Sequence, residues 1–171
     1  MDTLKDPLTP EVILRAAAPA EWPIITSHRR AMFAEMRHPP EALLDELDAA
    51  FGPWVAERLA RGEYQAWFAV NAAGAVVGGA GLWLMDWPPH VLHVEPRRAN
   101  ILNVYVQPEY RRRGLARALT GKAVDWCRQH RVRLVILHAS PAGRPLYQAL
   151  GFAATNEMSL ALDLDQTGAA A

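Results

Sequence analysis

The stretch from Leu102 to His130 constrains the fold most, because it combines a strand pattern, a basic turn and a long helical pattern. Its apolar run ends at Val106, and the helical spacing begins after Arg111-Arg112-Arg113-Gly114. A helix that begins here leaves several backbone N–H groups unpaired next to three cations, so the turn can hold an anion such as a phosphate. Gly114 and Ala116 would let a bulky phosphate approach the backbone closely. On the turn alone, a surface turn with three solvated arginines is an equally good reading.

Composition limits the chain to one globular domain without a strong charge bias. Of its 171 residues, 51% are hydrophobic and 21% are charged, which is enough for a sizeable core. Eighteen basic and eighteen acidic side chains cancel, and this argues against nucleic acid or a membrane surface as a partner. A single cysteine, Cys127, excludes an intramolecular disulfide framework. Since the sequence also shows no secretory leader and no apolar run that could span a bilayer, we expect a cytoplasmic protein.

We expect one domain over residues 11–164, between a flexible N-terminus at 1–10 and a disordered tail at 165–171. The first part of this domain is read as a short strand at 12–15 followed by two helices. Apolar residues at three- and four-residue spacing predict a helix over 19–36. A second helix over 41–51, with Leu43, Leu44 and Leu47 inward, should end at Gly52-Pro53, before another turn or two at 54–60.

The pattern then changes to that of strands. Residues 64–70 and 75–85 predict an antiparallel hairpin around a turn at 71–74. Gly78, Gly79 and Gly81 would weaken an ordinary strand, and they indicate a bulge or a close approach by another backbone or a ligand. Residues 86–98 form a long connection with three prolines and two histidines, a candidate lid or substrate loop.

A strand over 99–106, a helix and a strand over 132–138 follow in order, and a right-handed crossover makes these two strands parallel neighbours. The helix between them should bury Leu115, Leu119, Ala123 and either Trp126 or Cys127. A short helix from Gly143 to Gly151 comes next, and alternating apolar residues predict a last strand over 152–164.

Three motifs in this order resemble the GCN5-related N-acetyltransferase (GNAT) family. The acetyl-CoA-binding signature of that family is similar to Val106-x-Pro108-Glu109-Tyr110-Arg111-Arg112-Arg113-Gly114-Leu115-Ala116, and its second motif to Leu146-Tyr147-x-x-x-Gly151-Phe152. The strand pair before the cradle resembles Gly74-x-Val76-Val77-Gly78. The resemblance implies an α/β, single-domain acyl-CoA N-acyltransferase (GNAT) fold. Its mixed, mostly antiparallel sheet would hold a central, splayed parallel strand pair and be flanked by helices.

The resemblance also implies roles for individual residues toward acetyl-CoA as co-substrate. Backbone amides of the cradle would hold the pyrophosphate, and the strand before it would bind the pantetheine arm and the thioester carbonyl. Ser140 stands where the family often has an asparagine, and its hydroxyl could supply that pantetheine contact. The donor-binding residues implied are Val104, Tyr105, Val106, Arg111, Arg112, Arg113, Gly114, Leu115, Ala116, Ser140 and Arg144.

Tyr147 matches the family's catalytic tyrosine, which would donate a proton to the departing thiolate. Its alternative is a core tyrosine in a short helix. The amine acceptor must lose a proton, and we rank Glu35 first as general base because a carboxylate there could also attract a cationic acceptor. Each candidate base also reads as an ordinary solvated or packed side chain. The other candidates are Asp86, His90, His93, Glu95 and His138.

We therefore expect an acyltransferase that moves an acetyl group from acetyl-CoA to a primary amine, of a small molecule or a peptide, by direct attack in a ternary complex. The alternative is a non-catalytic acyl-CoA binding or sensing module on the same fold. A third reading, a phosphate-loop nucleotide hydrolase, is disfavoured because the lysine and the serine or threonine that it needs do not follow Gly114. We expect no metal, because the motif His90-x-x-His93-x-Glu95 lacks a fourth ligand. An exposed edge of the final strand would allow a homodimer.

Overall fold

A six-stranded sheet in the order β1-β2-β3-β4-β5-β6 carries the fold, in a computed structural model that describes residues 3–4, 12–91 and 94–161. All neighbouring strands are antiparallel except β5 and β6, which are parallel. This confirms the mixed, mostly antiparallel sheet with one parallel pair. The strands are β1 (Thr3–Leu4), β2 (Val12–Ala16), β3 (Tyr64–Asn71), β4 (Val76–Asp86), β5 (Arg97–Val106) and β6 (Val135–Leu137).

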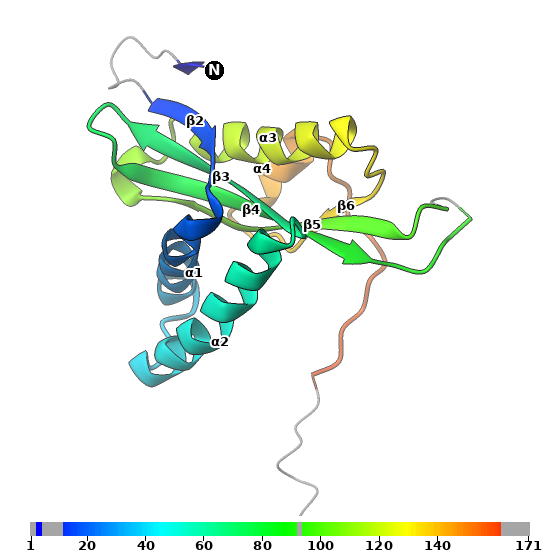
Figure 1. The fold of residues 1–171 in the computed structure, drawn as a ribbon, viewed down its shortest axis with the longest axis horizontal. Helices are drawn as coiled ribbons and strands as arrows, with labels where there is room; N and C mark the ends of the chain where they lie inside the picture. Colours follow the sequence, from blue (N-terminus) through cyan, green and yellow to red (C-terminus); the bar gives the residue numbers. More distant parts are fainter. Residues whose placement is uncertain (1–2, 5–11, 92–93, 162–171) are drawn as a thin grey trace, which may run out of the picture.

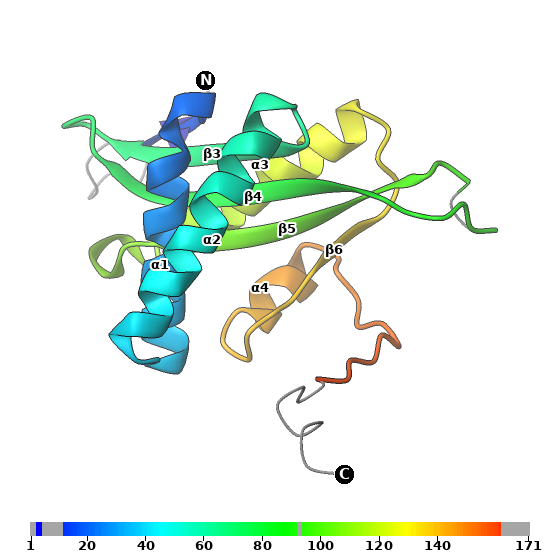
Figure 2. The same ribbon diagram turned by 60° about the horizontal axis from the view of Figure 1, so that its bottom comes forward.

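Helices cover both faces of this sheet. The pair formed by α1 (Trp22–Arg37) and α2 (Glu41–Ala60) lies on one face, and α3 (Leu115–Gln129) lies on the other (Figure 1). The short helix α4 (Arg144–Ala149) follows β6 near the edge of the sheet (Figure 2). There are also two short turns of 3-10 helix. The turn η1 (Pro19–Glu21) directly precedes α1, and η2 (Pro108–Tyr110) lies between β5 and α3.

Each face buries its own apolar cluster. On the α3 face, Leu119, Ala123 and Cys127 pack against the strands, as the helical spacing predicted. On the other face, Val55 of α2 and Phe68 of β3 pack in a second cluster and are almost fully buried. The sheet is thus held on both sides, with β5 between β4 and the short edge strand β6.

The predicted break at Gly52-Pro53 is wrong, because α2 continues through both residues as one helix. Proline removes one helical hydrogen bond. Here the residues after it, Val55 and Leu59, bury in the same cluster as Phe51, and this packing favours continuation. Leu43 was also expected inward but is 54% exposed, whereas Leu44 is buried.

The last predicted strand is wrong over residues 152–161, which adopt no regular structure. The alternating side chains Met158 and Leu160 are 94% and 83% exposed, so no described surface buries the apolar face that the pattern indicated. A period of two shows that a segment could pair but does not supply its neighbour. Residues 162–164 lie outside the described residues. The strand predicted over 132–138 is shorter than expected and is limited to β6.

The connection predicted over 86–98 is also shorter, because β4 extends to Asp86 and β5 begins at Arg97. These two strands project beyond the rest of the sheet as a two-stranded arm (Figures 1 and 2). Of residues 1–10, expected to be flexible, only Thr3 and Leu4 are described, and they pair with β2. The tail at 165–171 lies outside the described residues. No described helix is long and apolar enough to cross a membrane.

Candidate active site

The turn before α3 has the backbone shape of an anion cradle. Arg112 and Gly114 have φ angles of 62° and 78°, so the chain bends sharply just before the helix begins. No side chain caps the helix start, where Gly114 is the N-cap residue, and the first N–H groups of α3 therefore face outward without a helical partner. A methyl group on Gly114 would meet no atom within 4 Å. This open space at Gly114 would allow a phosphate to approach the N–H groups of the helix start.

The strand that leads to this cradle loses its parallel partner halfway. Strand β6 pairs only with Ala99, Asn100 and Ile101 of β5, whereas β5 continues to Val106. Along the last part of β5, the backbone groups on the β6 side have no strand neighbour among the described residues. This is the predicted splay, and it leaves main-chain groups of Val104 and the N–H of Val106 able to bind an extended ligand, whereas the Val106 carbonyl accepts a hydrogen bond from Nε of Arg111.

Tyr147 lies in α4, two residues before that short helix ends at Ala149. Its ring packs edge-on against Phe152 at 6.1 Å between centroids. Burial raises the pKa of Tyr147, so the phenol stays protonated at neutral pH. A protonated hydroxyl is the form that a general acid requires.

Ser140 shapes the turn into α4, and its Oγ accepts a hydrogen bond from the N–H of Gly143 at 3.1 Å. The hydroxyl proton stays available for a second group, as the predicted pantetheine contact would need. Arg144 is exposed at the first position of the same helix.

Glu35 is brought to the cradle from α1, and this junction was not foreseen. One carboxylate oxygen lies 2.5 Å from an NH2 group of Arg111, and the other accepts a hydrogen bond from the hydroxyl of Tyr105 at 3.2 Å. Arg111 also donates from Nε to the carbonyl of Val106. Burial, followed by the nearby Glu35 charge, raises the pKa of Tyr105. The structure thus joins three predicted residues into one cluster at the end of β5.

A buried polar network below this cluster was missed in the sequence. Asn103 has a φ angle of 55°, where the pairing between β4 and β5 shifts register. Its side chain accepts a hydrogen bond from Arg29 at 2.8 Å and donates one to the hydroxyl of Tyr64 at 2.9 Å. This network holds the irregular residue from which the splayed part of β5 begins. The only sequence signal for it was the glycine-rich stretch of the facing strand.

The bulge predicted at the glycines of β4 is present, because the pairing of β4 with β5 shifts register between Gly79 and Gly81. Another backbone approaches closely only at Gly78, whereas side chains approach Gly79 and Gly81. A methyl group on Gly81 would lie 1.8 Å from the hydroxyl oxygen of Tyr64, and one on Gly78 would lie 2.8 Å from the carbonyl oxygen of Tyr105. A methyl on Gly79 would lie 3.0 Å from Nδ1 of His28. Side chains from β3 and α1 thereby reach the surface of β4, and the network around Asn103 can form.

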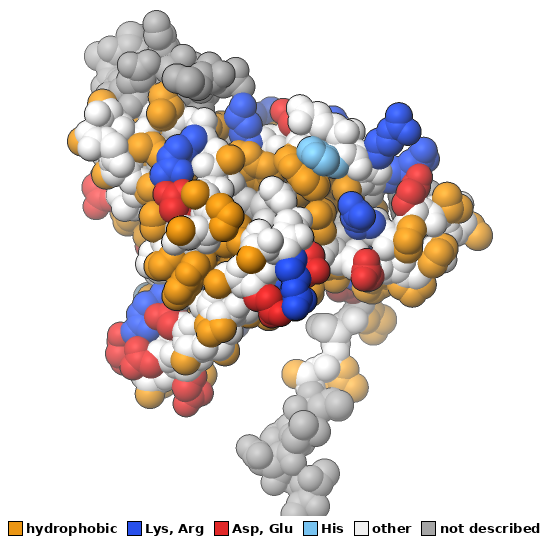
Figure 3. Space-filling model, viewed as in Figure 1, with side chains coloured by type: hydrophobic (Ala, Val, Ile, Leu, Met, Phe, Trp, Pro, Cys, Tyr) orange, Lys and Arg blue, Asp and Glu red, His pale blue; other side chains and the backbone are white. Residues whose placement is uncertain are grey.

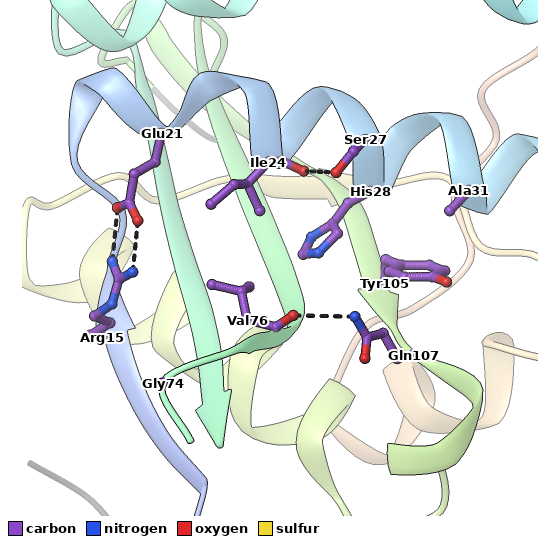
Figure 4. Close-up of a pocket in the computed structure, with 10 residues that line it drawn as sticks. All are labelled: Arg15, Glu21, Ile24, Ser27, His28, Ala31, Gly74, Val76, Tyr105 and Gln107. Carbon is purple, nitrogen blue, oxygen red and sulfur yellow. Dashed lines mark hydrogen bonds and ion pairs between the residues drawn. The ribbon is translucent and has the colours of Figure 1, made fainter. Parts of the chain in front are cut away.

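His28 is 7% exposed and points from α1 into a pocket of about 580 Å³ (Figure 4). The pocket lies between α1, the start of β4 at Val76 and the end of β5, where Tyr105 and Gln107 line it. The His28 ring lies 5.2 Å from that of Tyr105 and meets Phe68 edge-on. Burial lowers the pKa of His28 to about 4, so the imidazole is neutral at pH 7.

The other candidate bases are not gathered at the cradle. His138 is 81% exposed and lies 3.9 Å from Glu157. Glu95 forms an ion pair with Arg133, and His93 lies outside the described residues. Among residues 3–4, 12–91 and 94–161, no three histidine, cysteine or acidic side chains are placed to hold a metal ion. Burial raises the pKa of the Cys127 thiol to about 11, which leaves it unsuited to attack an acyl group.

A turn with the shape of an anion cradle at a helix start, directly after a splayed strand, and a protonated tyrosine further along the chain are features that acyl transfer from a phosphate-bearing thioester would use. The comparison with known families agrees, because a sequence model of the Acetyltransferase (GNAT) family matches residues 23–152. The chain therefore belongs to the GNAT family, and it is an acetyl-CoA-dependent N-acetyltransferase.

Solved structures support the same assignment. A GCN5-related N-acetyltransferase from Ralstonia eutropha JMP134 is 34% identical, with a TM-score of 0.82 over 88% of this chain and 98% of the other. A predicted acetyltransferase from Clostridium acetobutylicum, solved with acetyl-CoA, is 25% identical, with a TM-score of 0.77 over 92% and 99%. The glucosamine-6-phosphate N-acetyltransferase of Arabidopsis thaliana, 18% identical, shares the fold with a TM-score of 0.59 over 89% and 99%. The search of curated proteins found no match.

Proposed function

We propose that this enzyme transfers the acetyl group of acetyl-CoA to a primary amine by direct attack in a ternary complex. The observation that carries the proposal is the continuity of the cradle, the splayed end of β5 and the helix that holds Tyr147. On this proposal a long thioester would be held at its pyrophosphate by the cradle and at its carbonyl by β5, with α4 supplying the acid.

Donor binding begins at the cradle. Backbone N–H groups between Arg111 and Ala116 would hold the pyrophosphate, and the open space at Gly114 fits a group of that bulk. Arg112 and Arg113 are exposed and would add positive charge. Arg111 is already engaged by Glu35 and by the carbonyl of Val106, so its charge would act from a fixed position.

The main chain of β5 would hold the rest of the donor. The N–H and C=O groups of Val104 and the N–H of Val106 would bind the pantetheine arm and the thioester carbonyl. Tyr105, between them, turns its side chain toward Glu35 on the α1 face. The hydroxyl of Ser140 would donate to the pantetheine arm, and Arg144 at the start of α4 would face the same ligand.

Tyr147 acts as the general acid. The amine nitrogen forms a bond to the acetyl carbon, the bond from that carbon to sulfur breaks, and the electron pair goes to sulfur. The phenol then gives its proton to the thiolate, and the raised pKa of Tyr147 keeps that proton in place until the step occurs. The products are the acetylated amine and free CoA.

Glu35 is the proposed general base for the acceptor ammonium, directly or through one water. Glu35 extends from α1 to the end of β5, and its side chain is 41% exposed, so both water and an acceptor can reach it. Its hydrogen bond from Tyr105 and its ion pair with Arg111 fix the carboxylate beside the splay. A direct attack needs no acyl-enzyme, in agreement with the buried Cys127.

The experiment compares the wild-type enzyme with Tyr147→Phe across a panel of primary amines, with release of the CoA thiol as the readout. We expect kcat of the variant to fall about a hundredfold or more while the Kd for acetyl-CoA is nearly unchanged. Unchanged turnover in the variant would remove the assigned role. Binding of acetyl-CoA without thiol release by the wild-type enzyme for any amine would instead favour the sensing module. Size-exclusion chromatography would test the homodimer.

A further inference from the structure

The pocket that His28 enters runs along one face of α1, and we call it the α1 groove (Figure 4). Its walls come from a helix and two strands, namely Ile24, His28 and Ala31 of α1, Val76 of β4 and Tyr105 of β5. The three helix residues are four and three positions apart, so they share one face of α1. The next residue on that face is Glu35, one turn after Ala31. The proposed general base therefore lies just beyond one end of the α1 groove.

His28 brings an unused hydrogen-bonding group into the α1 groove. It is 7% exposed, and its imidazole makes no hydrogen bond to any of the residues that the structure describes. Its ring nitrogens are not among the polar atoms that are sealed off from solvent, so a molecule in the groove can reach them. Because burial holds the pKa of His28 at about 4, the ring is neutral at pH 7, and it offers one donor and one acceptor. A buried group of this kind gains most from a ligand that supplies its missing partner.

The α1 groove carries no net charge. Among the described residues that line it, only Arg15 and Glu21 are charged, and they lie at the end opposite Tyr105 (Figure 4). Two hydrogen bonds, of 2.8 and 2.6 Å, join the guanidinium of Arg15 to both carboxylate oxygens of Glu21. Each charge thus already has its partner, and neither is left for a charged ligand.

Other acidic side chains gather away from the α1 groove, at the end where α1 and α2 are joined (Figure 3). They contact Arg30 and do not line the groove, namely Glu41, Asp45 and Asp48. The described walls of the groove therefore offer apolar surface from Ile24, Ala31 and Val76 together with the neutral imidazole. Such a lining suits an uncharged polar group, because a charge would lose its water without gaining a partner.

Tyr105 connects the α1 groove to Glu35. Its ring centroid lies 5.2 Å from that of His28, and its hydroxyl donates a hydrogen bond to Glu35 at 3.2 Å. His28 and Glu35 lie on one face of the same helix, and the helical rise separates them by about 10 Å along its axis. A ligand that bonds to both would use about 2.9 Å at each end for the hydrogen bonds. Its two polar groups would then lie about 5 Å apart.

We propose that the α1 groove holds the body of the amine acceptor, and that His28 selects acceptors with an uncharged hydrogen-bonding group about 5 Å from the amine nitrogen. A carboxamide or a hydroxyl is a group of this kind. The proposal rests on the proposed function, because it takes Glu35 as the base for that amine. Ile24 and Val76 would pack against any carbon chain that continues along the groove toward Arg15 and Glu21.

The test measures binding of butylamine, 4-aminobutanamide and 4-aminobutanoate to the wild-type protein saturated with CoA, by NMR titration. In extended 4-aminobutanamide the carbonyl carbon lies about 5 Å from the amine nitrogen. We expect this amide to bind about tenfold tighter than butylamine, and 4-aminobutanoate to bind no tighter than butylamine. His28→Phe keeps a ring without nitrogens and should lose the preference, whereas His28→Gln should keep part of it.

His130→Phe is the matched control, because it makes the same change at the end of α3, on the other face of the sheet, and it should keep the full preference. Circular dichroism shows whether each variant is folded. Ala31→Leu retains His28 but narrows the α1 groove, so it should weaken binding of 4-aminobutanamide, and it serves as the second variant if His28→Phe does not fold.

Equal affinity of the wild-type protein for butylamine and 4-aminobutanamide would overturn the proposal, as would tighter binding of 4-aminobutanoate than of the amide. An unchanged preference in folded His28→Phe, or unchanged binding in Ala31→Leu, would also overturn it. Thiol release with the same compounds is measured separately. If the preference and its loss are observed but no amine is acetylated, the proposed function fails and the α1 groove stands as a site for an uncharged ligand. Acetylation without the preference removes this inference and leaves the proposed function standing.

Discussion

Protonation of His28 should set how the stability of this fold depends on pH. The folded protein holds the pKa of this imidazole at about 4 by burial, against 6.5 in an unfolded chain. Between these two values the unfolded state binds more protons, so the free energy of unfolding rises with pH. The stabilising difference is fully present above pH 6.5 and is lost as the pH falls toward 4. From the two pKa values, the loss between pH 7 and pH 5 is about 2 kcal/mol.

The assay is urea unfolding at pH 7, 6 and 5, followed by tryptophan fluorescence, for the wild-type protein and His28→Gln. Carboxylates also titrate in this range, and the comparison with the variant removes their shared contribution. We expect the variant to lose about 2 kcal/mol less than the wild-type protein between pH 7 and pH 5. Parallel pH profiles of the two proteins would refute the reasoning, because they would show that the buried ring contributes no linked protonation.

Two further substitutions test the packing and the chemistry around β5. Gly81→Ala places a methyl 1.8 Å from the hydroxyl oxygen of Tyr64, so we expect about 3 kcal/mol of destabilisation in urea unfolding. Gly121→Ala, where a methyl meets no atom within 4 Å, is the control and should be neutral or stabilising. Glu35→Gln removes the proposed base, and kcat with an amine acceptor at pH 7 should fall about a hundredfold. Wild-type turnover in this variant would show that another group takes the proton.

Much of the fold could be predicted because the period of the apolar residues changes along the chain. The buried face of helix α3 and the glycine at its start could both be recognised from the sequence. The order of strand, helix and strand implied the parallel pair. The errors occurred where tertiary packing decides. Helix α2 continues through Pro53 because Val55 and Leu59, which follow it, are buried. Residues 152–161 have a strand period without a neighbour to pair with.

In the candidate site, too, the parts that are local in sequence could be predicted and the contacts between distant residues could not. The cradle is local in sequence, so its residues could be found from the motif around Gly114. The contact of Glu35 with Arg111 joins residues that are 76 positions apart, and in the buried network Asn103 lies 74 positions from Arg29 and 39 from Tyr64. A lone asparagine in a strand pattern gives no sign that it holds a left-handed conformation. The glycines of β4 gave a signal of close approach, but not the identity of the groups that approach.

The most direct test of the account is a calorimetric titration of CoA into the wild-type protein and into Gly114→Glu. A carboxylate at this position would occupy the open space before α3 and repel the pyrophosphate, although the φ angle of 78° adds backbone strain, so circular dichroism must first show that the variant is folded. The account predicts saturable binding to the wild-type protein and none to the folded variant. Equal affinity of CoA for both proteins would contradict it, because the pyrophosphate would then lie somewhere other than the cradle.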